Sequence, residues 1–250
     1  MTGERGGVVS GERDARHSFV FATPIARASI AILAIVAGAA ALVPELASTD
    51  PRAIGDVLAL RFVAPGGTDA AGSWHPLGTD RFGRDIFVRM MLAARLSLIV
   101  GLAGSTLAGA LGIALGVLAG WYSGIADRLL MALSDALQAI PRLILLLVFA
   151  ALWKPGAWMI IAVLIVTGWM GVARLVRAEV LGLRARPFAE AAYALGARPR
   201  RIVWRHILPN ALGPAVVAIT LGVGNAILLE SGLSFLGLGI QPPQPSWGNM

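Results

Sequence analysis

Apolar residues occur along this chain in long blocks, not in the one-by-one alternation that a half-buried β-strand shows. Five blocks carry few or no charges, and they cover residues 28–44, 96–126, 129–153, 155–173 and 207–229. A helix needs about 20 apolar residues to cross the ~30 Å core of a bilayer, because each residue advances only ~1.5 Å. The pattern predicts an all-α, polytopic transmembrane helical bundle with five spans. Pro155-Gly156 marks the break between the third and fourth spans.

The second block carries small residues at a regular spacing. Gly104, Ala108, Gly112, Gly116 and Gly120 recur every four residues, which places them on one face of a helix. Small side chains let two helix backbones approach closely, and close approach drives helix association in lipid. We therefore expect this glycine ladder to pack against another helix or subunit. The alternative is a helix that is merely rich in glycine.

Composition supports a membrane protein and excludes several chemistries. Hydrophobic residues make up 57% of the chain and charged residues only 14%, whereas soluble proteins have about 25% charged residues. The chain has no cysteine, which excludes disulfides, thiolate catalysis and cysteine metal sites. The three histidines lie far apart in sequence, so we expect no metal site.

The positive charge is concentrated in one segment. The formal net charge is +7, and residues 174–205 hold eight arginines against two glutamates. Charge gathered beside an apolar span favours a cytoplasmic membrane face over a nucleic-acid groove, so we expect membrane lipid as a partner and no nucleic acid. A cytoplasmic N-terminus puts thirteen Lys and Arg residues inside and seven outside. Residues 1–21, with glycine, serine and mixed charge, are typical of a disordered cytoplasmic tail.

The polar segment before the last span predicts a short helix. Pro187 suits a first helical position, Glu190 lies in the positive first turn, and Gly196 is placed to end the helix. A second short helix starts at Pro199, and Pro209 marks the entry into the fifth span.

One face of the first short helix has the shape of a docking surface. It combines Phe188, Ala191, Ala192 and Leu195, which follow one another at helical spacing. A helix this short is marginal in water by itself, so something packs on it. The residues alone leave two partners open, which are another protein and the anionic headgroups of the membrane.

The spacing Glu190-Ala191-Ala192, three residues, Gly196 and then Leu208-Pro209 resembles the EAA loop of bacterial ABC importer permeases. His206 departs from that pattern, since many of these permeases have isoleucine there. The stretches "HPLGTDRFGRDIF" (75–87), "ARLSLIVG" (94–101) and "LSFLGLGIQPPQPSWGNM" (233–250) resemble the C-type permease subunits of dipeptide, oligopeptide and nickel importers. The resemblance covers the chain from about residue 22 onward.

This resemblance implies a permease subunit that forms half of a transmembrane pathway in the bacterial inner membrane. A homologous second permease, two cytoplasmic ATP-binding ATPase subunits and an extracytoplasmic substrate-binding protein would complete the importer. Glu190, Ala191, Ala192 and Gly196 would form the helix that couples to the ATPase, and Leu208-Pro209 would join it to the fifth span.

The chain itself is not expected to be an enzyme or to hold a cofactor. Its single lysine, Lys154, lies between Trp153 and Pro155, outside any phosphate-binding loop, and no catalytic residue is assigned. Peptide and nickel importers share the motifs above, so the resemblance leaves the substrate open.

The resemblance also suggests how the chain is organised. Residues 22–90 would hold the first span and an extracytoplasmic loop, and residues 91–250 the permease transmembrane domain, with the coupling loop at 187–209. The resembled permeases have six spans and this sequence has five, so we expect that the last helix is missing by truncation.

Three charged residues lie in or beside the apolar blocks. Asp135, Arg142 and Glu230 are candidates for the pathway or an interface, because a buried charge costs a few kcal/mol. Asp135 and Arg142 are ~10 Å apart along a helix, so they need a bend at Pro141 to pair. Alternatively, Asp135 lies at the wet cytoplasmic end, Arg142 snorkels or meets the partner permease, and Glu230 faces water.

Other functions remain open at this stage. An ion-coupled carrier or passive channel could use Asp135 and Glu230, and a structural scaffold would rely on the glycine ladder. In the loop before the second span, Asp80, Arg81, Arg84 and Asp85 could bind the external protein. We favour a polar loop that satisfies its own groups and caps the second span.

Overall fold

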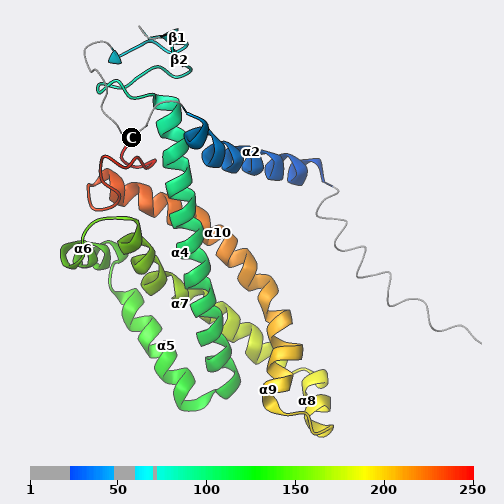
Figure 1. The fold of residues 1–250 in the computed structure, drawn as a ribbon. Coiled ribbons are helices and arrows are strands. Elements are labelled where there is room, and N and C mark those ends of the chain that lie inside the picture. Colours follow the sequence, from blue (N-terminus) through cyan, green and yellow to red (C-terminus); the bar gives the residue numbers. More distant parts are fainter. Residues whose placement is uncertain (1–22, 48–59, 70–71) are drawn as a thin grey trace, which may run out of the picture. The chain divides into compact units, whose positions relative to one another are not determined.

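The structure is a computed structural model, and it describes residues 23–47, 60–69 and 72–250. The predicted tail, residues 1–21, lies outside the described residues. The helices are α2 (Pro24–Leu46), α4 (Ile86–Tyr122), α5 (Gly124–Ala139), α6 (Arg142–Leu152), α7 (Ala157–Arg184), α8 (Pro187–Ala194), α9 (Pro199–Ile202), the π-helical turn η1 (Val203–Ile207) and α10 (Leu208–Phe235) (Figure 1). The strands β1 (Gly67–Thr68) and β2 (Trp74–His75) pair antiparallel. The chain forms two compact units, residues 1–95 and 96–250.

The helices confirm an all-α polytopic membrane protein. Among the described residues, four helical stretches are long and apolar enough to cross a membrane, namely α2, α4, α7 and the continuous stretch Pro199–Phe235. Helix α5 and residues 144–152 of α6 form a pair bent by 88°, which makes a fifth span if the pair is taken as one.

The third predicted span, residues 129–153, consists of two helices in the structure, α5 and α6. Helix α5 ends at Ala139, and Ile140 takes an extended backbone with φ −81° and ψ 124°. Pro141 explains the break, because its ring disfavours a helical conformation at the preceding residue and it lacks the N–H that a continuing helix needs.

Two other spans differ from their predicted limits. Helix α4 already begins at Ile86 and ends at Tyr122, where Ser123 and Gly124 take positive φ values of 48° and 70°. Helix α7 continues past residue 173 to Arg184. Its charged last turns are tolerated because two of their arginines have carboxylate partners on α5.

Those partners form two ion pairs between α5 and α7. Arg177 donates two hydrogen bonds to Asp127, and Arg174 donates one to Asp135 at 2.5 Å. A planar guanidinium that binds a carboxylate through two N–H groups fixes orientation as well as distance. The pairs therefore hold α5 along the second half of α7.

The glycine ladder of α4 lies against α7. A Cβ atom added to Gly112 would lie 2.6 Å from the Trp169 carbonyl oxygen, and one added to Gly116 would lie 2.6 Å from the Ala173 oxygen. These distances are too short for any real side chain, so the two backbones touch through the ladder. Buried apolar residues of α7 fill the space beside it and form the core with α4, η1 and α10.

Gly116→Ala should destabilise the bundle, because the added methyl group overlaps the Ala173 carbonyl. Overpacking of this kind costs about 1–3 kcal/mol. Unfolding in mixed detergent micelles, followed by circular dichroism, measures the change. Gly224→Ala on α10 is the matched control, since nothing lies within 4 Å of its Cβ position. Equal free energies of unfolding for the two variants would contradict the close contact.

Candidate functional site

The short helix α8 has the limits that the sequence indicates. Arg186 precedes it in an extended conformation, Pro187 takes the first turn, and Gly196 follows the last turn with φ +76°. The Ala197 N–H donates to the Ala192 carbonyl, and the Gly196 N–H donates to the Tyr193 carbonyl. These two hydrogen bonds close the helix in a Schellman motif, which needs a residue with a left-handed backbone conformation at the position of Gly196.

The two sides of α8 differ from the prediction. Ala189 is buried, and Ala192 packs partly against the core cluster of α7, α9, η1 and α10. Phe188, Ala191 and Leu195 point outward instead, and 87% of the Leu195 surface is exposed. Ala192 therefore lies on the packed side of α8 and not with the other three residues of the predicted face. Leu195 and Glu190 are exposed on the other side.

Aromatic contacts fasten α8 to the end of α4. The Tyr193 ring stacks on Trp121 with centroids 6.2 Å apart and planes 5° apart. The guanidinium carbon of Arg184 lies 5.6 Å from the centroid of the same indole ring. The guanidinium also donates a hydrogen bond to the Trp121 backbone carbonyl at 2.8 Å. The ring of Phe188 also contacts the ring of His206 in η1, and their centroids are 6.4 Å apart. Sequence reasoning missed these contacts, since the residues that make them are not neighbours in the chain.

Pro209 stands in the first turn of α10, at the start of the fifth span as the sequence indicates. The chain before it is also helical, because α9 and η1 run into α10 without a break from Pro199 to Phe235. Pro209 has no N–H to give to the carbonyl one turn earlier, and the preceding turn widens into η1. There the Leu208 N–H donates to the Val203 carbonyl, and the Asn210 side chain donates to the His206 carbonyl at 2.6 Å.

The structure separates the three charged candidates. Asp135 is exposed and pairs with Arg174, while the Nε of Arg142 donates to the Thr167 hydroxyl at 3.2 Å. Asp135 and Arg142 lie on the two arms of the bent pair α5–α6, and within residues 72–250 no ion pair joins them. The bend at Pro141 thus does not bring them together.

Glu230 is completely buried, so of the two alternatives the one in which it faces water is wrong. Its two carboxyl oxygens accept hydrogen bonds from Ser97 at 2.7 Å and from Ser234 at 2.6 Å. Ser234 also accepts from the Ile240 N–H, and Ser97 accepts from the Trp247 N–H. The Glu230 network therefore ties α4, α10 and the segment after α10 to one another.

A small, mostly apolar cavity lies at the glycine ladder. It has a volume of about 160 Å³, and α4, α7 and α10 form its walls together with Arg142 of α6. Ser105, Asn225 and Arg142 supply its polar groups, and Gly104 and Ala108 belong to the apolar part of its lining. Arg142 is thus the one of the three charged candidates that lines this cavity.

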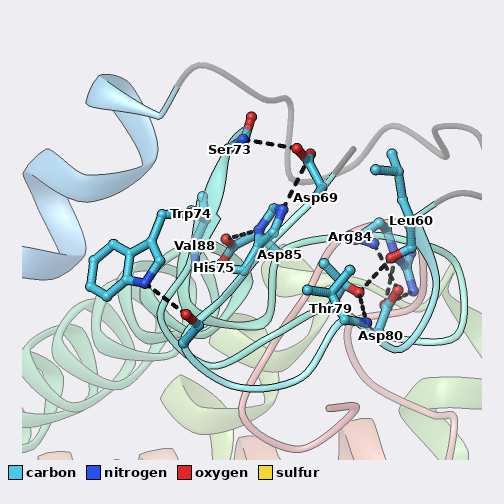
Figure 2. Close-up of polar contacts among 12 residues, drawn as sticks. Leu60, Asp69, Ser73, Trp74, His75, Thr79, Asp80, Arg84, Asp85 and Val88 are labelled. Atoms are coloured by element: carbon cyan, nitrogen blue, oxygen red, sulfur yellow. Dashed lines mark hydrogen bonds and ion pairs between the residues drawn. The ribbon is translucent and has the colours of Figure 1, made fainter. Parts of the chain in front are cut away.

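In the smaller unit, the loop before α4 satisfies its own polar groups (Figure 2). The Nδ1 of His75 lies 2.6 Å from an Asp85 oxygen, and the Nε2 lies 3.4 Å from an Asp69 oxygen. The other Asp85 oxygen accepts from the Val88 N–H at 2.9 Å, which confirms that this loop caps the second span. Among the described residues, no group of three or more His, Cys, Asp or Glu side chains is arranged to hold a metal.

Asp80 organises the other half of this loop. It accepts hydrogen bonds from the backbone N–H groups of Phe82 and Arg84 and from the Arg84 side chain. Burial raises the pKa of the Asp80 carboxyl, but these hydrogen bonds and the Arg84 charge together lower that pKa below its ordinary value. Asp80 therefore stays charged down to acidic pH and holds the turn. Thr79, which sequence reasoning missed, donates to the Leu60 carbonyl at 2.5 Å.

These features define a multi-pass α-helical membrane protein in which a short helix, α8, packs against the ends of the spans. Residues 112–250 match the family described as "Binding-protein-dependent transport system inner membrane component". The chain belongs to this family of transport-system components.

Several relatives carry peptide-transport names. The chain is 40% identical over 176 residues to the oligopeptide transport system permease protein OppC of Bacillus subtilis, and 42% identical over 176 residues to its dipeptide transport system permease protein DppC. Each match covers 70% of this chain. The match covers 58% of the oligopeptide permease and 55% of the dipeptide permease. A putative peptide transport system permease protein of Brucella suis is 39% identical over 224 residues, which cover 90% of this chain and 73% of the relative. The chain thus spans less than two thirds of the length of the first two relatives.

Ser97→Ala should lower the free energy of unfolding by about 1–3 kcal/mol, because it removes one donor from the buried Glu230 carboxyl. Unfolding in mixed detergent micelles provides the measurement. Thr106→Ala is the control on the same helix, since Thr106 is exposed and bonds only to carbonyls of its own helix. A loss in the control as large as in Ser97→Ala would show that the Glu230 network adds nothing specific.

Proposed function

We propose that this chain is the permease subunit of an ATP-driven importer and that α8 is the element through which cytoplasmic ATPase subunits move it. A second, homologous permease would complete the pathway, two ATPases would lie below, and an extracytoplasmic binding protein would deliver the substrate. The names of the relatives favour peptides as the substrate class, and nickel stays the alternative. Family membership supports the general scheme.

The observation that carries the coupling role is the exposed outer side of α8. Phe188, Ala191 and Leu195 present apolar surface to water beside the exposed Glu190. A contiguous apolar surface on a polar segment is typical of a protein contact site. Insertion into a groove of a partner would bury this surface, whereas the inner side of α8 is already occupied by its own chain.

The contacts of α8 with its own chain suit it to transmit movement. The Tyr193–Trp121 stack joins it to α4, and the Phe188–His206 contact joins it to η1, which continues into α10. A displacement of α8 therefore acts on two helices that also form walls of the cavity with Arg142. Closure of the ATPases would rock these helices between inward-facing and outward-facing arrangements.

The ion-coupled alternative gains no support from the surroundings of its two carboxylates. Asp135 is exposed and paired with Arg174, and Glu230 is buried with two serine donors. The cavity is lined by neither of them.

The proposal requires α8 to face the cytoplasm together with the N-terminus. Because the chain has no cysteine, single-cysteine variants report accessibility directly. In intact cells, a membrane-impermeant maleimide should label Arg81→Cys and leave Leu195→Cys unlabelled until the membrane is permeabilised. Both positions are exposed in the structure. The opposite labelling pattern would refute the orientation and the ATPase contact with it.

Glu190→Arg and Leu195→Asp should each reduce co-purification of the ATPase subunits and lower ATP-driven uptake tenfold or more, because a change of ~1.4 kcal/mol in binding is tenfold. Gly196→Pro should do the same, since proline cannot take a positive φ. The matched control is Leu236→Asp, at an exposed leucine just past α10, which should leave ATPase association unchanged. Normal uptake and association in Glu190→Arg, Leu195→Asp and Gly196→Pro alike would defeat the coupling role.

A further inference from the structure

An apolar groove runs between the last third of α4 and the stretch from α9 into α10. It has a volume of about 590 Å³. Its walls include Ala110, Ala114 and Leu118 on α4, and Val203, Leu208 and Leu212 on the other side. The residues on each side are about one turn apart, so each wall follows one side of its helix. The groove belongs to the larger unit alone.

The length of the groove fits one leaflet of a bilayer. Its α4 wall runs from Ala110 to Tyr122, which is ~18 Å of helix at ~1.5 Å per residue. Half of the ~30 Å hydrocarbon core is ~15 Å. An extended acyl chain of one leaflet therefore matches this groove, whereas a transmembrane helix would extend well beyond it.

Aromatic and charged residues gather at one end only. Trp121 and Tyr122 end α4 there, and Trp204 and Arg200 face them. Tryptophan and tyrosine are enriched at the level of the lipid headgroups. The groove thus has an apolar body and an interfacial end, which is the polarity of a phospholipid.

A second hollow adjoins this end and is lined by arginines. It is shallow and open, and its surface is mostly apolar. It shares Arg200 and Trp204 with the groove and adds Arg198 and Arg201. All three arginines are exposed, and no ion pair links any of them to a carboxylate in the described part of the chain. Guanidinium groups bind phosphate oxygens through paired N–H donors. The charge therefore complements an anionic headgroup.

We propose that this groove binds one anionic phospholipid of the cytoplasmic leaflet. An acyl chain lies between α4 and α10, and the phosphate is held by Arg200, Arg198 and Arg201. The proposal uses the cytoplasmic orientation of α8 from the proposed function, since the anionic leaflet lies on that side. The lipid would contact α4 beside Trp121 and also η1, the two elements that hold α8.

Native mass spectrometry of the detergent-purified chain tests this site. Titration with phosphatidylglycerol should give one saturable bound lipid, and phosphatidylcholine with the same acyl chains should bind at least tenfold more weakly. Arg200→Gln should weaken phosphatidylglycerol binding about fivefold, which is the effect of ~1 kcal/mol per basic residue at an anionic surface. Ala114→Phe should weaken both lipids, because the ring fills the groove at an exposed position without entering the core.

Arg205→Gln is the matched control. This substitution removes the same charge from an exposed side chain, but Arg205 lines neither hollow. An equal loss in Arg200→Gln and Arg205→Gln, or equal affinity for the two lipids, would overturn the proposal and indicate general charge attraction. Unchanged phosphatidylglycerol binding in Ala114→Phe would also overturn it.

A cross-linking experiment in membranes identifies the occupant. A photoreactive group on Ala114→Cys should give an adduct with phosphatidylglycerol in the assembled transporter. An adduct with another protein subunit, or no lipid adduct, would overturn the proposal. The outcome is distinguishable from failure of the coupling role, which is read from ATPase association in variants of α8.

Discussion

The close approach of α4 and α7 is the contact on which the rest of the larger unit depends. Within a bilayer the lipid tails are as apolar as the helices, so no water has to be excluded to bring helices together. Association then depends on how near two backbones can come. The carbonyl oxygens of Trp169 and Ala173 lie where side chains of Gly112 and Gly116 would otherwise stand.

The two ends of α4 serve different parts of the molecule. At one end, Trp121 receives the Tyr193 ring and the Arg184 side chain, and this fixes the short helix below the spans. Toward the other end, Ser97 reaches Glu230 on α10. A polar group buried in a bundle is costly unless it is bonded, and here both carboxyl oxygens have a donor. Helix α4 therefore takes part both in the attachment of α8 and in a buried polar network.

Periodicity was sufficient to predict the helices but not the partners between them. Apolar blocks gave the all-α class, and the positions of Pro187 and Gly196 gave the short helix, because these are local properties of the chain. Pro141 broke the third span at a place that the hydrophobic pattern alone did not mark. The partners of Glu230 and Asp135 could not be predicted, since Ser97 lies 133 residues from Glu230 and Arg174 lies 39 residues from Asp135. Such pairings depend on how far helices rotate and cross, which sequence spacing does not encode. The inward side of α8 was missed for the same reason.

The widened turn before Pro209 has a geometric effect on the surface beside it. In a regular α-helix, residues four apart drift by about 40° around the axis at each step, so a row of them winds away from any straight neighbour. Arg200, Trp204, Leu208 and Leu212 are spaced in fours, yet all four face the same hollow along α4. The extra residue in η1 offsets the drift and keeps the row aligned. A proline that interrupts one backbone hydrogen bond thus places the cationic end and the apolar end of this row on the same side of the helix.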